Sequence, residues 1–320
     1  MADPVVAVDV GGTNIRAAVV DRQLEQHART HRLLDKSSPS ALLEAIASAV
    51  AQVIATCPNA AGIGVSMKGL VDHTTGTMVQ STSLGMTGLP VKAFLEARFG
   101  LLAAVENDVH TATIGENHLG AGRRYRDFIY LNVGTGIAAG LILNGALYRG
   151  AANLAGEFGH NTVDVHGWPC PCGMRGCLEE FASGPGVAEQ VRLLAGTYPH
   201  TSLAPLIAIG RTRATDVWKA ADLGDDLARR VLGDTVLHLG AGLVNLVNML
   251  NPEAIILGGG AFDEAGVLAR RLDEFVRTRA MHVPAASIRE IALSTLGSNE
   301  VGLLGAASLI WEYRSLFPPT

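Results

Sequence analysis

A short motif occurs twice in this chain, and its repetition limits the possible folds more than any other feature. Val8-Asp9-Val10-Gly11-Gly12-Thr13 and Leu131-Asn132-Val133-Gly134-Thr135-Gly136 each join an apolar run to a glycine turn, and a second apolar run follows. A strand, a glycine turn and a return strand form a β-hairpin. A long-range repeat of this kind predicts two lobes that are built in similar ways.

The remaining periodicity predicts a mixed α/β fold. Apolar residues at helical spacing predict helices over residues 40–54, 226–250 and 302–316. Short apolar runs predict strands over residues 5–8, 15–20, 62–65, 101–105, 128–133, 137–143, 254–257 and 287–293. Mixed strands and helices are typical of an α/β architecture. We place the lobe boundary near Gly120, which predicts a small lobe of residues 1–119 plus 303–320 and a large lobe of residues 120–302.

Composition excludes several classes of protein. The 320 residues suffice for two domains, and 48% hydrophobic with 17% charged residues excludes a disordered chain. The net charge of −5 argues against a nucleic-acid partner. No uninterrupted apolar run reaches the ~18 residues of a membrane span, and residues 1–4 lack the basic and apolar regions of a signal peptide. We therefore expect a cytoplasmic enzyme without a membrane partner.

Three glycine-rich turns follow predicted strands and are candidates for binding phosphate. They are Gly11-Gly12-Thr13-Asn14, Gly134-Thr135-Gly136 and Gly258-Gly259-Gly260. Glycine lets backbone N–H groups converge on an anion, although none of the turns matches the P-loop or the dinucleotide fingerprint. Asp9 could hold Mg²⁺ directly or through water, or it could satisfy N–H groups of its own turn. Together these features predict a nucleotide clamped between the two hairpins.

A polar segment, Glu106-Asn107-Asp108, comes directly after a predicted strand. This is where α/β proteins place functional residues. A carboxylate there can accept a proton from a substrate hydroxyl, as the base of a kinase does, and Asn107 can orient hydroxyl groups. The alternative is an Asx turn or a helix cap.

Four residues supply the ligand set of a closed zinc site: His160, Cys170, Cys172 and Cys177. A zinc deaminase is the rival interpretation, but its His-x-Glu and Pro-Cys-x-x-Cys signature differs in order and spacing. A structural zinc site is therefore favoured. The remaining cysteine, Cys57, is predicted to be a buried apolar residue. Glu157 and Glu179 flank the module, either as surface carboxylates or as ligands of a polyhydroxylated substrate.

At this point the chain resembles the ROK family (repressors, open reading frames and kinases) of sugar kinases over nearly its whole length. Three segments carry the resemblance: Asp9-Val-Gly-Gly-Thr-Asn14, Val133-Gly-Thr-Gly136 through Gly156-Glu-Phe-Gly-His160, and Cys170-Pro-Cys172-Gly-Met-Arg-Gly-Cys177-Leu-Glu179. The resemblance implies an actin-like, ribonuclease H-like two-lobed ATPase fold with ATP and sugar in a cleft between the lobes. It also implies a homodimer.

The resemblance further implies a role for individual residues. Asp108 would be the general base toward the sugar hydroxyl. The sugar contacts would be Asn107, Glu157, His160 and Glu179, and His160 would also hold zinc. The adenosine end of ATP would lie near Gly258-Gly259-Gly260.

Two segments depart from the family pattern. Ser66-Met67-Lys68-Gly69 replaces a common Pro-Gly, and the segment near Thr82-Ser83-Leu84 lacks an Asn that is typically a hydroxyl ligand. We therefore expect Ser66, Gly69 and Ser83, with Lys68, to contact an acceptor other than ordinary glucose: another hexose, an aminosugar or a sugar-like cyclitol. The alternative for Lys68 is a solvated loop charge.

The predicted function is ATP-dependent phosphorylation of a hydroxymethyl group on a hexose or hexose-like ring, at the 6-OH or its equivalent. A DNA-binding repressor would need a helix-turn-helix ahead of the first strand, where four residues leave no room for one. A non-catalytic sugar-binding regulator is a second alternative, against which the intact Asp108 counts. An ATPase or chaperone of the same fold would leave the zinc module unexplained.

Overall fold

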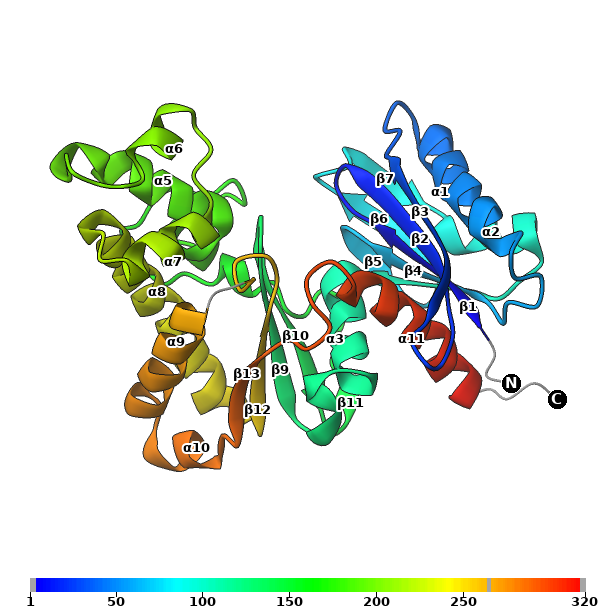
Figure 1. The fold of residues 1–320 in the computed structure, drawn as a ribbon. Coiled ribbons are helices and arrows are strands. Elements are labelled where there is room, and N and C mark those ends of the chain that lie inside the picture. The colour runs from blue at the N-terminus through cyan, green and yellow to red at the C-terminus, as the bar shows by residue number, and fades with distance from the viewer. Residues whose placement is uncertain (1–3, 264–265, 317–320) are drawn as a thin grey trace. The chain divides into compact units, whose positions relative to one another are not determined.

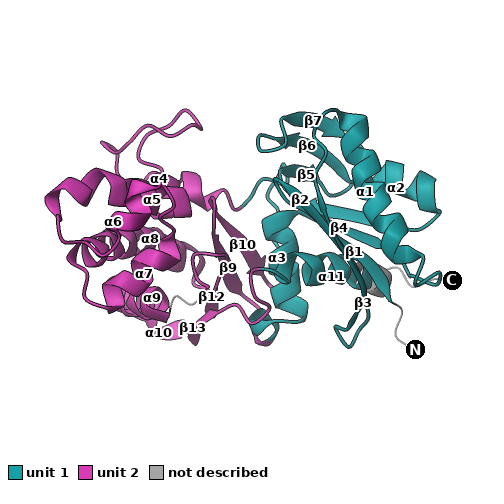
Figure 2. Ribbon diagram, turned by 45° about the horizontal axis from the view of Figure 1, so that its top comes forward, with its two compact units in different colours: residues 1–123, 147–155, 299–320 teal, residues 124–146, 156–298 magenta. Residues whose placement is uncertain are grey.

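The chain folds into two compact units in the computed structural model, which describes residues 4–263 and 266–316. Unit 1 comprises Met1–Arg123, Leu147–Ala155 and Asn299–Thr320, and unit 2 comprises Arg124–Ala146 and Gly156–Ser298 (Figure 2). Residues 1–3, which the sequence analysis used against a signal peptide, lie outside the described residues. The lobe division predicted from the sequence stays a prediction, and the units below are described with their own bounds.

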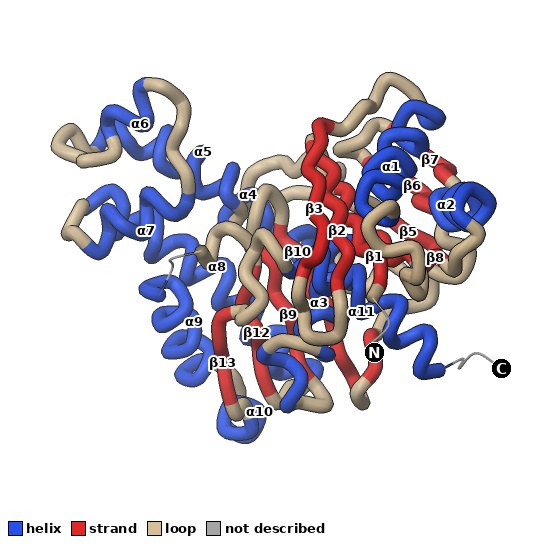
Figure 3. The backbone as a smooth tube through the Cα atoms, turned by 45° about the vertical axis from the view of Figure 1, so that its right-hand side comes forward, coloured by secondary structure: helices blue, strands red, loops and turns tan. Residues whose placement is uncertain are grey.

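The main sheet of unit 1 has five strands in the order β3-β2-β1-β4-β8 (Figure 3). Its strands are β1 (Val5–Val10), β2 (Asn14–Val20), β3 (Gln26–Leu33), β4 (Ile63–Met67) and β8 (Ala103–Asn107). β1 and β2 pair antiparallel through the first glycine turn, and β1, β4 and β8 run parallel. The first predicted hairpin is therefore confirmed, whereas β3 was not predicted because polar residues dominate it.

Helices cover both faces of this sheet (Figure 1). The helices of unit 1 are α1 (Pro39–Ile54), α2 (Val91–Phe99), α3 (Asp108–His118) and α11 (Val301–Leu316), with the 3₁₀ turn η1 (Ala121–Arg124). α1 begins at Pro39, one residue before the predicted start, because the Ser38 hydroxyl caps the helix by accepting a hydrogen bond from the N–H of Ala41. α1 and α2 pack on one face, and α3 and α11 pack on the other.

A small antiparallel sheet, β5-β6-β7, follows β4 in the chain. Its strands are β5 (Leu70–Asp72), β6 (Thr77–Ser81) and β7 (Met86–Leu89). Gly69 leads into it with φ of +126°, and a Cβ on Gly69 would lie 2.6 Å from the Gln80 carbonyl oxygen, so only glycine fits. This sheet was not predicted from the sequence, and its β6–β7 turn carries the 82–84 segment.

The sheet of unit 2 repeats the arrangement of unit 1, with the order β11-β10-β9-β12-β13. Its strands are β9 (Phe128–Val133), β10 (Ile137–Leu143), β11 (Ala146–Leu147), β12 (Ala254–Gly258) and β13 (Glu290–Leu293). β9 and β10 form the antiparallel hairpin, and β9, β12 and β13 run parallel. The repeated motif thus marks equivalent hairpins in two sheets of the same topology, as predicted.

Figure 1 shows the helices of unit 2 gathered on one side of its sheet. They are α4 (Leu178–Ala182), α5 (Gly184–Leu194), α6 (Ala204–Ala208), α7 (Ala214–Asp222), α8 (Asp226–Leu250), α9 (Gly266–Arg279) and α10 (His282–Ser287), with 3₁₀ turns η2 (Phe158–His160) and η3 (Ala195–Thr197). α8 ends at Leu250, and the C-cap residue Asn251 adopts a left-handed conformation before Pro252. The predicted strand at 287–293 is wrong over its first three residues, because α10 continues through Ser287.

Helix α8 contains an 18-residue window that is apolar enough to cross a membrane by length and composition alone. However, 56% of that window is buried inside the protein. Its buried face, which includes Leu239, Leu243 and Val247, belongs to the hydrophobic core of unit 2. Burial against α4, α7 and α9 accounts for the apolar composition of α8 without a membrane.

The packing of α11 on unit 1 depends on two glycines. A Cβ on Gly64 of β4 would lie 1.8 Å from the carbonyl oxygen of Ala306, and a Cβ on Gly305 would lie 2.2 Å from that of Thr111 in α3. No real Cβ occupies such positions, so both glycines let backbones approach more closely than a side chain permits. The C-terminal helix is thereby held against the centre of the N-terminal unit.

We expect Gly305→Ala to destabilise the protein by about 1–3 kcal/mol, because the added methyl group overpacks the α11–α3 contact. Gly233→Ala is the matched control, since Gly233 is also helical and a Cβ there would meet nothing within 4 Å. That control should gain up to about 1 kcal/mol from the better helix propensity of alanine. Urea unfolding followed by circular dichroism measures both, and equal stabilisation by the two substitutions would contradict the packing argument.

Candidate active site and metal centre

Asp108 lies at the first position of α3, directly after β8, as the sequence predicts. Asn107 caps this helix, because its Oδ1 accepts hydrogen bonds from the N–H groups of Val109 (2.9 Å) and His110 (3.1 Å). The Nδ2 of Asn107 donates to the carbonyl oxygen of Gly69 at 2.9 Å. The helix-cap interpretation of Asn107 is therefore correct, and the same cap fixes the backbone that carries Asp108.

The Asp108 carboxylate pairs with the side chain of Lys68. Lys68 Nζ lies 3.9 Å from Asp108 Oδ2, and the side chains of Lys68 and Asp108 are 38% and 32% exposed. Desolvation raises the pKa of Asp108 above its ordinary value; the Lys68 charge opposes this rise, and the Asp9 charge adds to it. A carboxylate with a raised pKa binds a proton more readily, which suits a general base. Lys68 is thus an ion-pair partner of Asp108 rather than a fully solvated loop charge.

Segments of unit 1 that are distant in sequence converge around this pair. The N–H of Lys68 donates to the carbonyl oxygen of Val10 at 3.0 Å, which ties the 66–69 segment to the first glycine turn. A Cβ on Gly12 of that turn would lie 3.9 Å from the Cβ of Ser83. Ser83 is exposed, whereas Ser66 is fully buried in β4 and its hydroxyl has no hydrogen-bond partner among the described residues. The predicted contact of Ser66 with substrate stays a prediction.

Asp9 sits at the end of β1, where Arg16 on the paired strand β2 holds it. Arg16 donates to Asp9 Oδ2 through Nε (3.2 Å) and Nη2, and its Nη1 donates to the Asn299 carbonyl oxygen at 2.6 Å. The carboxylate is 12% exposed and lies against Gly302, where a Cβ would come within 2.8 Å of it. One oxygen of Asp9 is therefore committed to Arg16, and its other oxygen is the donor available to a hard cation such as Mg²⁺.

A cavity of about 640 Å³ opens beside this turn in unit 1. It is lined by Asp9, Gly11, Thr13, Asn14, Arg16, Arg29, His31, Asn299 and Glu300. Four of the predicted phosphate-side residues are in this set, and Gly12 is not. The cationic residues were not predicted, although Arg16 follows the turn by two positions and pairs in register with Asp9.

The second and third glycine turns meet in unit 2. The N–H of Ala261 donates to the carbonyl oxygen of Val133 at 3.0 Å, and the N–H of Gly184, at the start of α5, donates to that of Gly134 at 2.8 Å. A cavity of about 630 Å³ lies there. It is lined by Gly134, Thr135, Gly184, Pro185, Ala188, Thr212, Arg213, Ala214, Thr215, Lys219, Gly260, Ala261 and Asp263.

Not every predicted glycine lines this cavity. Gly258 is needed because a Cβ would lie 2.4 Å from the Tyr130 hydroxyl, and Gly259 has φ of +89°. Both shape the turn, whereas Gly260 lines the cavity. The residues from α5 and α7 were not predicted. For the α5 part the available signal was Ser183-Gly184-Pro185, a helix cap followed by proline.

Glu179 connects the second glycine turn to the cysteine-rich loop. Its Oε2 accepts a hydrogen bond from the N–H of Ile137 at 2.8 Å. A Cβ on Gly136 would lie 2.6 Å from the same oxygen, so glycine is required for the carboxylate to approach. Gly136 thus makes room for Glu179. Glu157, in contrast, is an exposed side chain whose Oε2 lies 4.0 Å from His160 Nε2.

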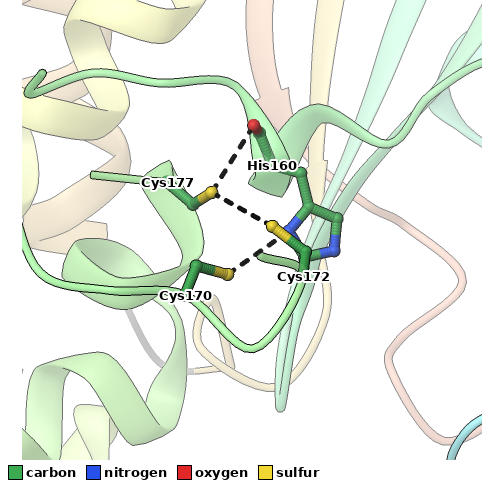
Figure 4. A group of neighbouring side chains, drawn as sticks. All are labelled: His160, Cys170, Cys172 and Cys177. Atoms are coloured by element: carbon green, nitrogen blue, oxygen red, sulfur yellow. Dashed lines mark hydrogen bonds between the residues drawn. The ribbon is translucent and has the colours of Figure 1, made fainter. Parts of the chain in front are cut away.

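The structure brings the four predicted metal ligands together (Figure 4). One ligand atom from each of His160, Cys170, Cys172 and Cys177 lies within 4.8 Å of the others. Cys172 Sγ and Cys177 Sγ are 3.6 Å apart, and Cys170 Sγ and His160 Nδ1 are 3.7 Å apart. Ligands at zinc-binding distance around a tetrahedral centre are separated by roughly 3.8 Å, whereas a disulfide needs about 2.05 Å. The donor set and its spacing therefore fit zinc.

Burial opposes ionisation of two of the three thiols in the cluster. Burial raises the pKa of the Cys170 thiol to about 12 and also raises that of Cys177, whereas a hydrogen bond from the Met174 N–H lowers that of Cys172. A bound cation favours the thiolate forms. Cys57 is half-buried against the core of unit 1 rather than fully buried, and it stands apart from the cluster.

The two repeated sheets, the glycine turns and the cysteine cluster define a two-unit α/β protein. A family model described as the ROK family matches residues 5–312. The chain belongs to the ROK family.

The relatives include both kinases and repressors. A glucokinase of Halalkalibacterium halodurans is 32% identical over 317 residues, covering 97% of this chain and 96% of that protein. The crystal structure of a ROK family glucokinase from Streptomyces griseus in complex with glucose and AMPPNP has a TM-score of 0.80 and 29% identity, over 97% of this chain and 99% of that one. A xylose repressor of Bacillus spizizenii is 27% identical over 96% of this chain and 77% of its own length. The predicted family, fold and class, an ATP-dependent sugar kinase, are confirmed.

Proposed function

We propose that the protein transfers the γ-phosphoryl group of ATP to a hydroxymethyl group of a hexose or hexose-like ring, at the 6-OH or its equivalent. One observation carries this proposal: Asp108, Lys68, Ser83 and the first glycine turn converge within unit 1. A base, hydroxyl-binding groups and a phosphate-binding turn are the parts that phosphoryl transfer to an alcohol requires. The glucokinase relatives support the same reaction class.

In this proposal Asp108 removes the proton of the acceptor hydroxyl while the hydroxyl oxygen forms a bond to the γ-phosphorus. The bond between the γ-phosphorus and the oxygen that bridges to the β-phosphate breaks and releases ADP. Asn107, Gly69 and Ser83 position the acceptor from unit 1, with Ser66 behind them. The acceptor contacts proposed in unit 2 are Glu157, His160 and Glu179. Asp9 would hold Mg²⁺, which neutralises charge on the transferring phosphoryl group when bound. The turns at 11–14, 134–136 and 258–260 cradle the nucleotide.

Lys68 distinguishes this acceptor region from the usual family pattern and supports an acceptor other than glucose. Another hexose, an aminosugar or a neutral cyclitol is a candidate acceptor in a region in which the Lys68 charge is paired with Asp108. A non-catalytic sugar-binding regulator is the second candidate, which the repressor relatives favour. The cytoplasmic location and the homodimer stay proposals.

Asp108→Asn should lower kcat by on the order of 10²–10⁴-fold, because asparagine cannot accept the hydroxyl proton. Its unfolding temperature should stay equal or rise: the raised pKa of Asp108 means that the ionised carboxylate costs stability above that pKa, and asparagine removes this cost. ADP release measured over hexoses, aminosugars and cyclitols tests the variant and the wild type together. If none of the tested acceptors raises ADP release by the wild type above background, the regulator is favoured. If Asp108→Asn releases ADP as fast as the wild type, Asp108 is not the base.

Lys68→Met should move the acidic limb of the kcat/KM profile to higher pH. The Lys68 charge lowers the pKa of Asp108, so its removal lets that pKa rise, and the base is lost by protonation at a higher pH. Lys92→Met, on α2, is the matched control and should leave the limb in place. A limb that is unmoved, or that moves to lower pH, would contradict the pairing of Lys68 with Asp108.

We propose a structural zinc ion at His160, Cys170, Cys172 and Cys177. Cys172→Ala should reduce the zinc content by about one equivalent per chain and lower the unfolding temperature, because metal binding contributes directly to folding. Elemental analysis and thermal unfolding provide the two measurements. Cys57→Ala should keep the zinc, and an equal zinc content in both variants would refute the site.

A further inference from the structure

A buried ionic network lies behind the proposed base in unit 1. Glu106 is 1% exposed and His110 is 3% exposed, so both are cut off from water. Glu106 Oε2 accepts a hydrogen bond from Arg149 Nε at 2.7 Å, and Glu106 Oε1 lies 3.3 Å from His110 Nδ1. Burial alone would raise the pKa of Glu106, but His110 and Arg149 outweigh it and lower that pKa. The network therefore holds an ionised carboxylate in the interior.

This network contacts the backbone that carries the base. Glu106 Oε1 accepts a hydrogen bond from the N–H of Asn107 at 2.9 Å. Asn107 in turn caps α3 through the N–H groups of Val109 and His110. The carboxylate of Glu106 thus fixes the N–H of the residue before Asp108, and the amide of Asn107 fixes the N–H groups of the two residues after it.

The other end of the network holds a strap, residues 147–155, that packs with unit 1 although the chain on both sides of it belongs to unit 2. Arg149 anchors the strap to Glu106. His110 Nε2 donates to the carbonyl oxygen of Ala155 at 3.0 Å. The N–H of Ala155 donates to the carbonyl oxygen of Arg149 at 3.0 Å and closes the strap on itself. Gly156-Glu157 follows directly, and Glu157 is one of the proposed acceptor contacts.

We propose that Glu106, His110 and Arg149 are positioning residues that fix Asp108 and Asn107 relative to the strap. By holding Asp108 in place, the network sets the rate of phosphoryl transfer. The inference rests on the proposed function. A buried carboxylate is costly unless it is paired, so a network with one member removed rearranges around Glu106 instead of keeping its geometry. A displacement of about 1 Å at a reacting group can cost ~10²-fold in rate.

The test is Arg149→Met, compared with Arg149→Lys and with Arg192→Met as the control. Arg192 forms an exposed ion pair with Glu189 on α5 and touches none of the proposed site residues. At a temperature well below unfolding, Arg149→Met should lower kcat by about 10–100-fold with the KM for ATP unchanged. Arg149→Lys should recover part of that loss, and Arg192→Met should match the wild type. A purely structural role would lower the unfolding temperature and leave kcat intact.

A double-mutant cycle identifies the group through which the network acts. In an Asp108→Asn background, Arg149→Met should lower kcat by less than about 2-fold, because its effect is already lost with the base. If Arg149→Met does not fold, His110→Gln takes its place in the same cycle. The proposal would be overturned if Arg149→Met lowered kcat by the same factor in both backgrounds. It would also be overturned if the single variant, Arg149→Met or its replacement His110→Gln, kept the wild-type kcat. Absence of any acceptor-dependent ADP release by the wild type would instead refute the proposed function.

Discussion

The close approach of α11 to β4 and α3 is the constraint on which unit 1 depends. Gly64 and Gly305 let the helix backbone pack where no side chain would fit. The residues that precede the helix then reach the first glycine turn: the Asn299 carbonyl accepts from Arg16, and Glu300 pairs with Arg29. Gly302 leaves room for the Asp9 carboxylate. A packing feature near the end of the chain thus fixes the geometry of a turn near its beginning.

Unit 2 uses a carboxylate where unit 1 uses an arginine. Glu179 follows the last cysteine of the loop by two positions and accepts a hydrogen bond from the backbone just after Gly136. The order of the cysteine loop is therefore transmitted to the second glycine turn through one side chain. Both turns lie at the tip of a hairpin of the same topology, yet the first is held by Arg16 of its own strand β2 and the second by Glu179 from outside the hairpin.

Much of this organisation was predictable from the sequence, because the strongest signals are local. Apolar runs that end in glycine turns identified both hairpins, and the spacing of His160, Cys170, Cys172 and Cys177 identified the cluster. The polar strand β3 and the β5–β7 sheet gave no apolar run and were missed. Pairings between distant residues, such as Arg149 with Glu106, depend on chain crossings, which composition and spacing do not encode. For the same reason the α5 and α7 residues of the unit 2 cavity were not predicted.

The discontinuity of unit 1 has a consequence for how the protein is made. Unit 2 is complete once residue 298 has been synthesised, whereas unit 1 still lacks α11 at that moment. Domains fold as units as the chain emerges from the ribosome. We therefore expect the N-terminal sheet, which is made first, to be the last to reach its native packing. The face of β4 that α11 covers stays uncovered until the end of translation. That apolar face must therefore be protected from aggregation in the nascent chain until α11 has been synthesised.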